Sequence, residues 1–138
     1  MINNLIINSL EFPQQMELKE IITFFCQSLG LNKEVQIKAF ITLFIESKYG
    51  KGVIPEEIAD KCDIKVKESQ NLLDKFMQTG IARRSRDRYV IRENSMSMTL
   101  DSILDDIFLI SRNLKRACVI IDRKATKNAV GKLLDEWK

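Results

Sequence analysis

The chain of 138 residues contains no histidine, and this absence removes several kinds of chemistry. Without imidazole there is no Ser-His-Asp triad, no Cys-His dyad and no histidine ligand for zinc or haem. The three cysteines, Cys26, Cys62 and Cys118, lie far apart, so neither a disulfide framework nor a structural metal site is expected. Such cysteine use is typical of a reducing, cytoplasmic compartment.

Glycine, proline and long apolar runs are also scarce. Five glycines and two prolines favour a mainly helical chain. The apolar runs span only a few residues, so no membrane segment is expected, and the first residues lack the pattern of a signal peptide. No phosphate loop, nucleophile elbow or metal motif occurs, and the adjacent pairs Glu56-Glu57 and Asp105-Asp106 diverge on a helix. We therefore expect neither enzyme activity nor a cofactor.

Positive charge is concentrated in one part of the sequence. Residues 61–92 contain nine basic and four acidic side chains, a net charge of +5, whereas the rest of the chain carries −2. Five of the eight arginines fall between residues 83 and 92. A local basic segment on a near-neutral chain is typical of a site for a polyanion.

The apolar pattern predicts an arm and a main domain. Residues 1–13, which end at Pro13, are expected to form an extended N-terminal arm. Helices are predicted over residues 14–29, 32–48, 56–61 and 66–78, because apolar side chains recur at three- and four-residue spacing. Two β-prone runs, 81–84 and 89–92, are separated by a polar turn and predict a hairpin. Residues 14–95 thus form a domain that is mainly α with a small β-hairpin.

A heptad pattern runs from Leu100 to Ile121 within residues 96–138, the expected C-terminal helical region, and an amphipathic tail helix is predicted after it. Its apolar side chains follow steps of three and four residues, and the small helical core offers little surface to cover so long a stripe. We expect these helices to pair two subunits, with intramolecular packing as the alternative. The predicted dimerisation residues are Leu100, Ile103, Ile107, Ile110, Leu114 and Ile121.

Residues 54–82, IPEEIADKCDIKVKESQNLLDKFMQTGIA, and the preceding LGLNKEVQIKAF at residues 29–40 carry a family resemblance. Together with the hairpin, they resemble the core of MarR-like and TrmB-like transcription regulators over residues 29–92. The resemblance implies a winged helix-turn-helix fold with C-terminal dimerisation helices. It also implies DNA binding, with the second helix of the motif as the reading helix and the hairpin as the wing.

The residues themselves support a DNA-binding face. Helix 66–78 turns Leu73 and Phe76 inward, so its other side is free to enter a major groove. Gln70 and Asn71 suit paired hydrogen bonds to adenine, lysines suit guanine or phosphate, and the hairpin arginines suit the backbone or a narrow minor groove. The predicted DNA-binding residues are Lys65, Lys67, Glu68, Gln70, Asn71, Lys75, Arg83, Arg84, Arg86 and Arg88.

These features predict a cytoplasmic, homodimeric regulator of transcription that binds double-stranded DNA, and they leave any small-molecule effector open. The alternative is a winged-helix module that assembles a protein complex and does not read DNA. Glu68 and Asp74 would repel phosphate and favour this alternative. Salt dependence separates the two, because phosphate binding releases counterions and weakens steeply with salt.

Overall fold

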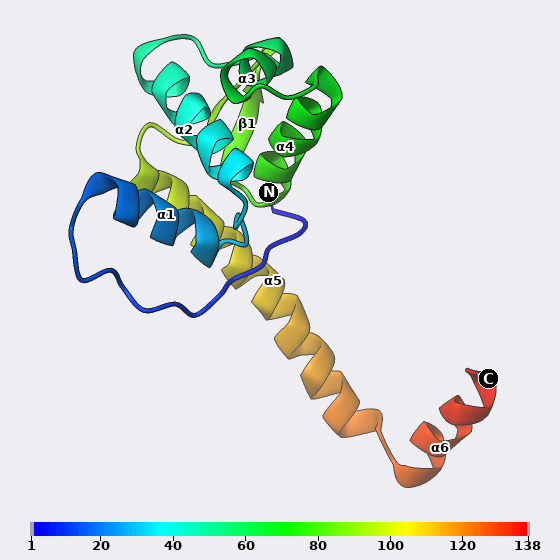
Figure 1. The fold of residues 1–138 in the computed structure, drawn as a ribbon. Coiled ribbons are helices and arrows are strands. Elements are labelled where there is room, and N and C mark those ends of the chain that lie inside the picture. The colour runs from blue at the N-terminus through cyan, green and yellow to red at the C-terminus, as the bar shows by residue number, and fades with distance from the viewer. Residues whose placement is uncertain (1, 138) are drawn as a thin grey trace. The chain divides into compact units, whose positions relative to one another are not determined.

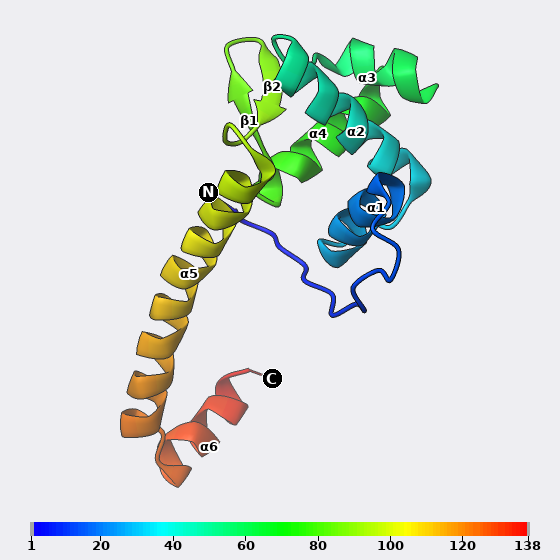
Figure 2. The same cartoon turned by 90° about the vertical axis from the view of Figure 1, so that its left-hand side faces the viewer.

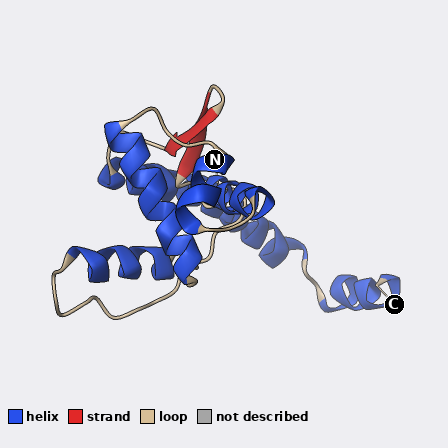
Figure 3. Cartoon of the chain, turned by 45° about the horizontal axis from the view of Figure 1, so that its top comes forward, coloured by secondary structure: helices blue, strands red, loops and turns tan. Residues whose placement is uncertain are grey.

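A computed structural model describes residues 2–137 (Figure 1). The elements follow the order α1 (Leu18–Ser28), α2 (Glu34–Tyr49), α3 (Pro55–Cys62), α4 (Val66–Gln78), β1 (Ala82–Ser85), β2 (Arg88–Ile91), α5 (Met96–Lys124) and α6 (Lys127–Glu136). The described residues are thus mainly helical with one two-stranded antiparallel sheet, which confirms the expected class at this level (Figure 3).

The chain divides into two compact units between Leu104 and Asp105. This division falls within α5, later than the boundary expected after residue 95, because the first turns of α5 belong to the core of the first unit. Thr99 and Ile103 are 0% and 1% exposed. A Cβ added to Gly80 would lie 3.2 Å from Cγ1 of Ile103, so these two segments are in close contact.

Helix α2 is the centre of the first unit and contacts α1, α3, α4 and β2 (Figure 2). Its buried side chains include Phe40, whose ring meets Phe76 of α4 edge to face with 6.5 Å between the centroids. Leu43 on the same helix is fully buried. Burying such side chains is worth about 1.5–3 kcal/mol each, so α2 holds the helices and the hairpin in one core.

The N-terminal arm runs to residue 17, and α1 begins later than the predicted residue 14. The arm is attached to the first unit through its backbone, because the amides of Asn3 and Asn4 donate to the carbonyl of Gln78 at 3.1 and 3.3 Å. Ile2 is 4% exposed, and Phe12 packs on Phe24 with 5.2 Å between the ring centroids. These contacts favour an extended segment over an early helix start.

The second unit consists of the remainder of α5 and helix α6. The hydroxyl oxygen of Thr126 accepts from the amide of Ala129 at 3.2 Å and caps α6. Every described residue from Phe108 to Trp137 is exposed, although many are apolar. No helix of the described chain is long and apolar enough to cross a membrane.

Candidate nucleic-acid interface

Helices α3 and α4 form a helix–turn–helix pair in which α4 has the predicted bounds. The turn is made possible by Asp63, which adopts a left-handed φ of 53° directly after α3. Ser69, Leu73 and Phe76 are fully buried, so one face of α4 is fixed against the core. The side chains on the other face are therefore turned to solvent.

The solvent face of α4 carries several of the predicted DNA-binding residues. Lys65, Lys67, Glu68 and Asn71 are exposed, and Lys75 is half-buried. Lys67 and Asn71 lie four residues apart, which places both on one side of the helix. Asn71 offers an amide that can both donate and accept, the combination that recognises adenine in the major groove.

The side chain of Gln70 is engaged within the protein, whereas the sequence predicted that it would contact DNA. Its Nε2 donates to Oδ1 of Asp74 and to the hydroxyl oxygen of Tyr89, each at 2.9 Å. An amide nitrogen has two hydrogens, so both are used within the protein. A paired hydrogen bond to adenine needs a free N–H beside the carbonyl, and this arrangement of Gln70 does not supply one.

The hairpin presents exposed arginines around a strained tip. Ser85 pairs with Arg88 across a two-residue loop, and Arg86 at the first loop position has φ of 62°. Glycine is preferred at such a position, and a left-handed conformation costs another residue about 1–2 kcal/mol. Arg83, Arg84 and Arg86 are all exposed.

Two of these arginines have partners near the hairpin itself. The Arg84 guanidinium lies over the Tyr89 ring at 5.1 Å from its centroid. Nε of Arg83 donates to the carbonyl of Arg92 at 3.0 Å. Both contacts orient the side chains while leaving them exposed.

Arg88 is separated from the other three predicted hairpin residues. Its NH1 lies 2.7 Å from Oε1 of Glu57 on α3 and donates to the carbonyl of Gly52 at 3.1 Å. The Arg88 side chain is one-third exposed. Its charge is therefore already paired, so this arrangement does not offer it to a phosphate as the sequence predicted.

Residues that the sequence did not single out attach the hairpin to the helices. The backbones of Val53 and Tyr89 exchange two hydrogen bonds, of 2.9 and 2.8 Å. Glu57 accepts from the amide of Ile54 at 3.0 Å as well as from Arg88. Glu57 follows Ile54 by three residues, and a glutamate at this spacing commonly caps the start of a helix. This spacing is the sequence signal that could have pointed to Glu57.

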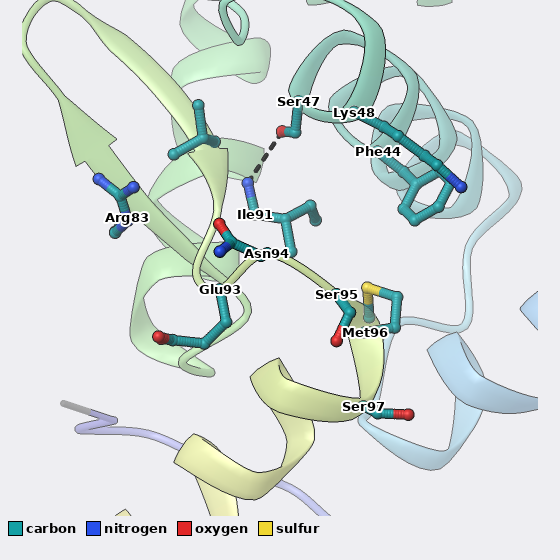
Figure 4. Close-up of a pocket in the computed structure, with 11 residues that line it drawn as sticks. Phe44, Ser47, Lys48, Arg83, Ile91, Glu93, Asn94, Ser95, Met96 and Ser97 are labelled. Atoms are coloured by element: carbon teal, nitrogen blue, oxygen red, sulfur yellow. Dashed lines mark hydrogen bonds between the residues drawn. The ribbon is translucent and has the colours of Figure 1, made fainter.

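A cavity of about 520 Å³ lies between α2, the hairpin and the start of α5 (Figure 4). The Ser47 hydroxyl oxygen, on its wall, accepts from the amide of Ile91 at 2.9 Å. Nζ of Lys48 lies over the rings of Phe44 and Tyr49, at 5.7 and 5.6 Å from their centroids. Within the lining, Ser47 is thus engaged with Ile91, and Lys48 with Phe44.

The predicted dimerisation residues do not form one continuous exposed stripe. Ile103 is 1% exposed and belongs to the core of the first unit, so a partner could not reach it. Ile107 is half-buried. Leu100, Ile110, Leu114 and Ile121 are exposed, the last two by 62% and 59%.

The cysteines differ in their surroundings. Burial raises the pKa of the Cys26 thiol to about 12. Burial also raises the pKa of Cys62, against the opposing effects of the Lys38 charge and a hydrogen bond with Thr42. Cys118 is exposed. Among residues 2–137 there is no group of three cysteine or carboxylate side chains that could hold a metal ion.

Comparisons with protein-family models, with curated proteins and with solved structures found no match to the chain. Function is therefore inferred from the charge, exposure and geometry of these residues.

Proposed function

We propose that the chain is a cytoplasmic regulator of transcription that binds double-stranded DNA through a winged helix-turn-helix. In this proposal α3 and α4 are the helix–turn–helix and β1–β2 is the wing. Helix α4 enters the major groove, where Asn71 and Lys67 meet base edges or phosphate. Arg83, Arg84 and Arg86 bind the backbone or the minor groove beside it.

The observation that carries the proposal is the conformation of Arg86. An exposed arginine occupies a loop position that glycine would fill with less strain. Strain of this kind persists where a side chain has a use, and a long cation at the tip of a hairpin suits a phosphate. Its neighbours strengthen this interpretation, because Arg83 and Arg84 are exposed on the adjoining strand.

The reading helix and the hairpin are also close enough to act together. The hydrogen bond between Gln70 and Tyr89 joins α4 directly to β2. Lys65, Lys67 and Asn71 are exposed on this same helix or at its start. A basic hairpin next to a polar helix face is the arrangement that a duplex requires.

A salt titration tests the proposal. We expect the chain to bind mixed-sequence duplexes with a dissociation constant that rises steeply between 50 and 200 mM salt. Arg83→Ala with Arg86→Ala should weaken binding and flatten the salt dependence by about two counterions. The matched control is Arg116→Ala, an exposed arginine of the second unit, which should change neither. Salt-independent binding, or none, would refute the proposal.

We also propose that a second copy of the chain covers the apolar surface of the second unit. The large exposed apolar residues there are Phe108, Leu109, Ile110, Leu114, Val119, Ile120, Ile121, Val130, Leu133, Leu134 and Trp137. So many exposed apolar side chains on two helices are typical of an interaction surface. A two-fold dimer suits a duplex, because two half-sites are then bound together.

A second candidate function is the assembly of a protein complex without DNA. One observation favours it: apolar residues of the arm and of the start of α1 are also exposed, namely Ile6, Ile7, Leu10, Phe12, Met16 and Leu18. A partner held by this surface would bind with little dependence on salt. The salt titration therefore separates the two candidates.

A further inference from the structure

The hairpin is attached to the helix–turn–helix by one side chain from each helix. Glu57 of α3 pairs with Arg88 at 2.7 Å, and Gln70 of α4 donates to the Tyr89 hydroxyl oxygen at 2.9 Å. Arg88 and Tyr89 are neighbours on β2, and neighbouring side chains of a strand point to opposite faces. The two bonds therefore hold opposite faces of the same strand.

An isolated two-stranded hairpin is marginally stable in water, so these attachments matter for its tip. Among the described residues, the backbone of β2 pairs outside the sheet in one bridge, to Val53, and its Ile91 amide donates to the Ser47 hydroxyl oxygen of α2 at 2.9 Å. Tyr89 is 3% exposed and the bond from Gln70 is partly buried, so water screens it less than a surface contact. The tip, with Arg86, lies only a few residues beyond both attachments.

We infer that Glu57 and Gln70 are positioning residues, which act through Arg88 and Tyr89 and do not touch DNA themselves. They fix the hairpin against α4, so that Asn71 and Arg86 meet a duplex as parts of one rigid unit. This inference rests on the proposed DNA binding. Once either Asn71 or Arg86 has bound the duplex, a rigid connection keeps the other residue at a high effective concentration near its own contact.

Two conservative substitutions act on the attachments and change little else: one removes the bond to Gln70, and the other weakens the pair with Arg88. Tyr89→Phe deletes the hydroxyl but keeps the ring on which Arg84 lies. Glu57→Gln deletes the charge, so the ion pair with Arg88 becomes a weaker neutral hydrogen bond, while the oxygen that accepts from the Ile54 amide is kept. Thr23→Ala is the matched control, because it removes one exposed hydrogen bond, to the carbonyl of Lys19, far along the chain from the hairpin.

The first measurement needs no DNA. Hydrogen exchange of the peptide covering residues 82–92 should be about ten-fold or more faster in Y89F/E57Q than in the parent, with α2 and α4 unchanged. T23A should exchange like the parent. If the double variant unfolds, Y89F and E57Q are measured singly, and each should show a smaller acceleration. Unchanged hairpin exchange overturns the inference, whatever the DNA result.

The second measurement is a double-mutant cycle on a duplex. Arg86→Ala should weaken binding about ten-fold in the parent but only about two-fold in Y89F/E57Q, because a more loosely held tip contributes less. A merely structural role would lower the thermal midpoint and leave the effect of Arg86→Ala unchanged, which also overturns the inference. Failure of the parent to bind any duplex would refute the proposed function instead, and the exchange result would still decide whether the two bonds hold the hairpin.

Discussion

Arg86 is both strained and exposed. Its effect on stability and its effect on DNA affinity can be separated by the choice of substitution. Arg86→Gly relieves the left-handed conformation, so the free energy of unfolding should rise by about 0.5–1 kcal/mol. Affinity for every duplex should fall and the salt slope should drop by about one, because one phosphate contact is lost. Chemical denaturation and a salt titration measure the two effects.

Arg86→Ala is the matched control for that change, since it loses the same charge and keeps the strain. It should lose affinity equally without the gain in stability. A glycine variant that bound DNA like the parent would contradict the role given to the tip. Arg88→Ala should behave differently from both, by loosening the hairpin, because Arg88 is paired with Glu57.

Asn71 is the residue of α4 expected to distinguish bases. Asn71→Ala should cost about 1–3 kcal/mol on a preferred duplex and little on a random one, since base contacts carry the discrimination. Lys67→Ala, one turn earlier, should weaken both duplexes alike, which a competition assay detects. Equal losses for Asn71→Ala on both duplexes would show that this side chain meets only phosphate.

The three thiols should react with an alkylating reagent in the order of their exposure. The thiolate is the reactive species, and a pKa of about 12 leaves almost none of Cys26 ionised at pH 8. Cys118 is exposed and should be alkylated first, Cys62 more slowly, and Cys26 only after unfolding. Mass spectrometry of timed samples measures this order, and early labelling of Cys26 would contradict its place in the core.

At the scale of elements, local sequence patterns predicted the bounds of helices and strands better than they predicted the contacts of side chains. The apolar spacing of residues 66–78 gave the bounds of α4, and the polar turn gave the hairpin, because both signals lie within a few residues. Gln70 and Arg88 were predicted as DNA contacts but are bound by Tyr89 and Glu57, 19 and 31 residues away. Ile103 fits the heptad pattern, yet it is buried in the first unit, close to Gly80. Such distant contacts leave no trace in local periodicity.

The attachment of β2 depends on a glycine in the segment before α3. Gly52 has φ of 98°, and a Cβ there would lie 2.5 Å from the carbonyl oxygen of Tyr89. Gly52→Ala should therefore lower the free energy of unfolding by roughly 1–3 kcal/mol and release the hairpin. Thermal unfolding checks the first effect and hydrogen exchange the second.

Gly131→Ala is a control for which the opposite change in stability is expected. Gly131 lies within α6, and an added Cβ would meet nothing within 4 Å. Gly131→Ala should stabilise that helix by roughly 0.5–1 kcal/mol. If both substitutions had the same sign, the close approach of Gly52 to β2 would not be the cause.

At the scale of the whole molecule, the exposed apolar residues of the second unit should decide the oligomeric state. Leu114 and Ile121 are 62% and 59% exposed. Leu114→Asp with Ile121→Asp should give a folded monomer in sedimentation experiments. Each lost side chain contributes about 1.5–3 kcal/mol to the pairing when fully buried. That monomer should bind one half-site weakly and lose the complex with two half-sites.

Lys132→Asp is the control, because it changes the net charge by the same amount and helical periodicity places Lys132 on the opposite face of α6 from Val130 and Leu134. This variant should remain dimeric. A parent chain that sediments as a monomer would contradict the proposed pairing.

One oxygen of Glu57 serves both the start of α3 and Arg88, and this sharing constrains how the sequence can change over evolution. A descendant with an aliphatic residue at position 57 would leave the guanidinium at 88 without its ion-pair partner and the amide at 54 without this acceptor. Three sites would then have to drift together: arginine would disappear from 88, and a serine, threonine or aspartate would arise at 54 to cap the helix. Divergent descendants should therefore carry either the whole set or none of it.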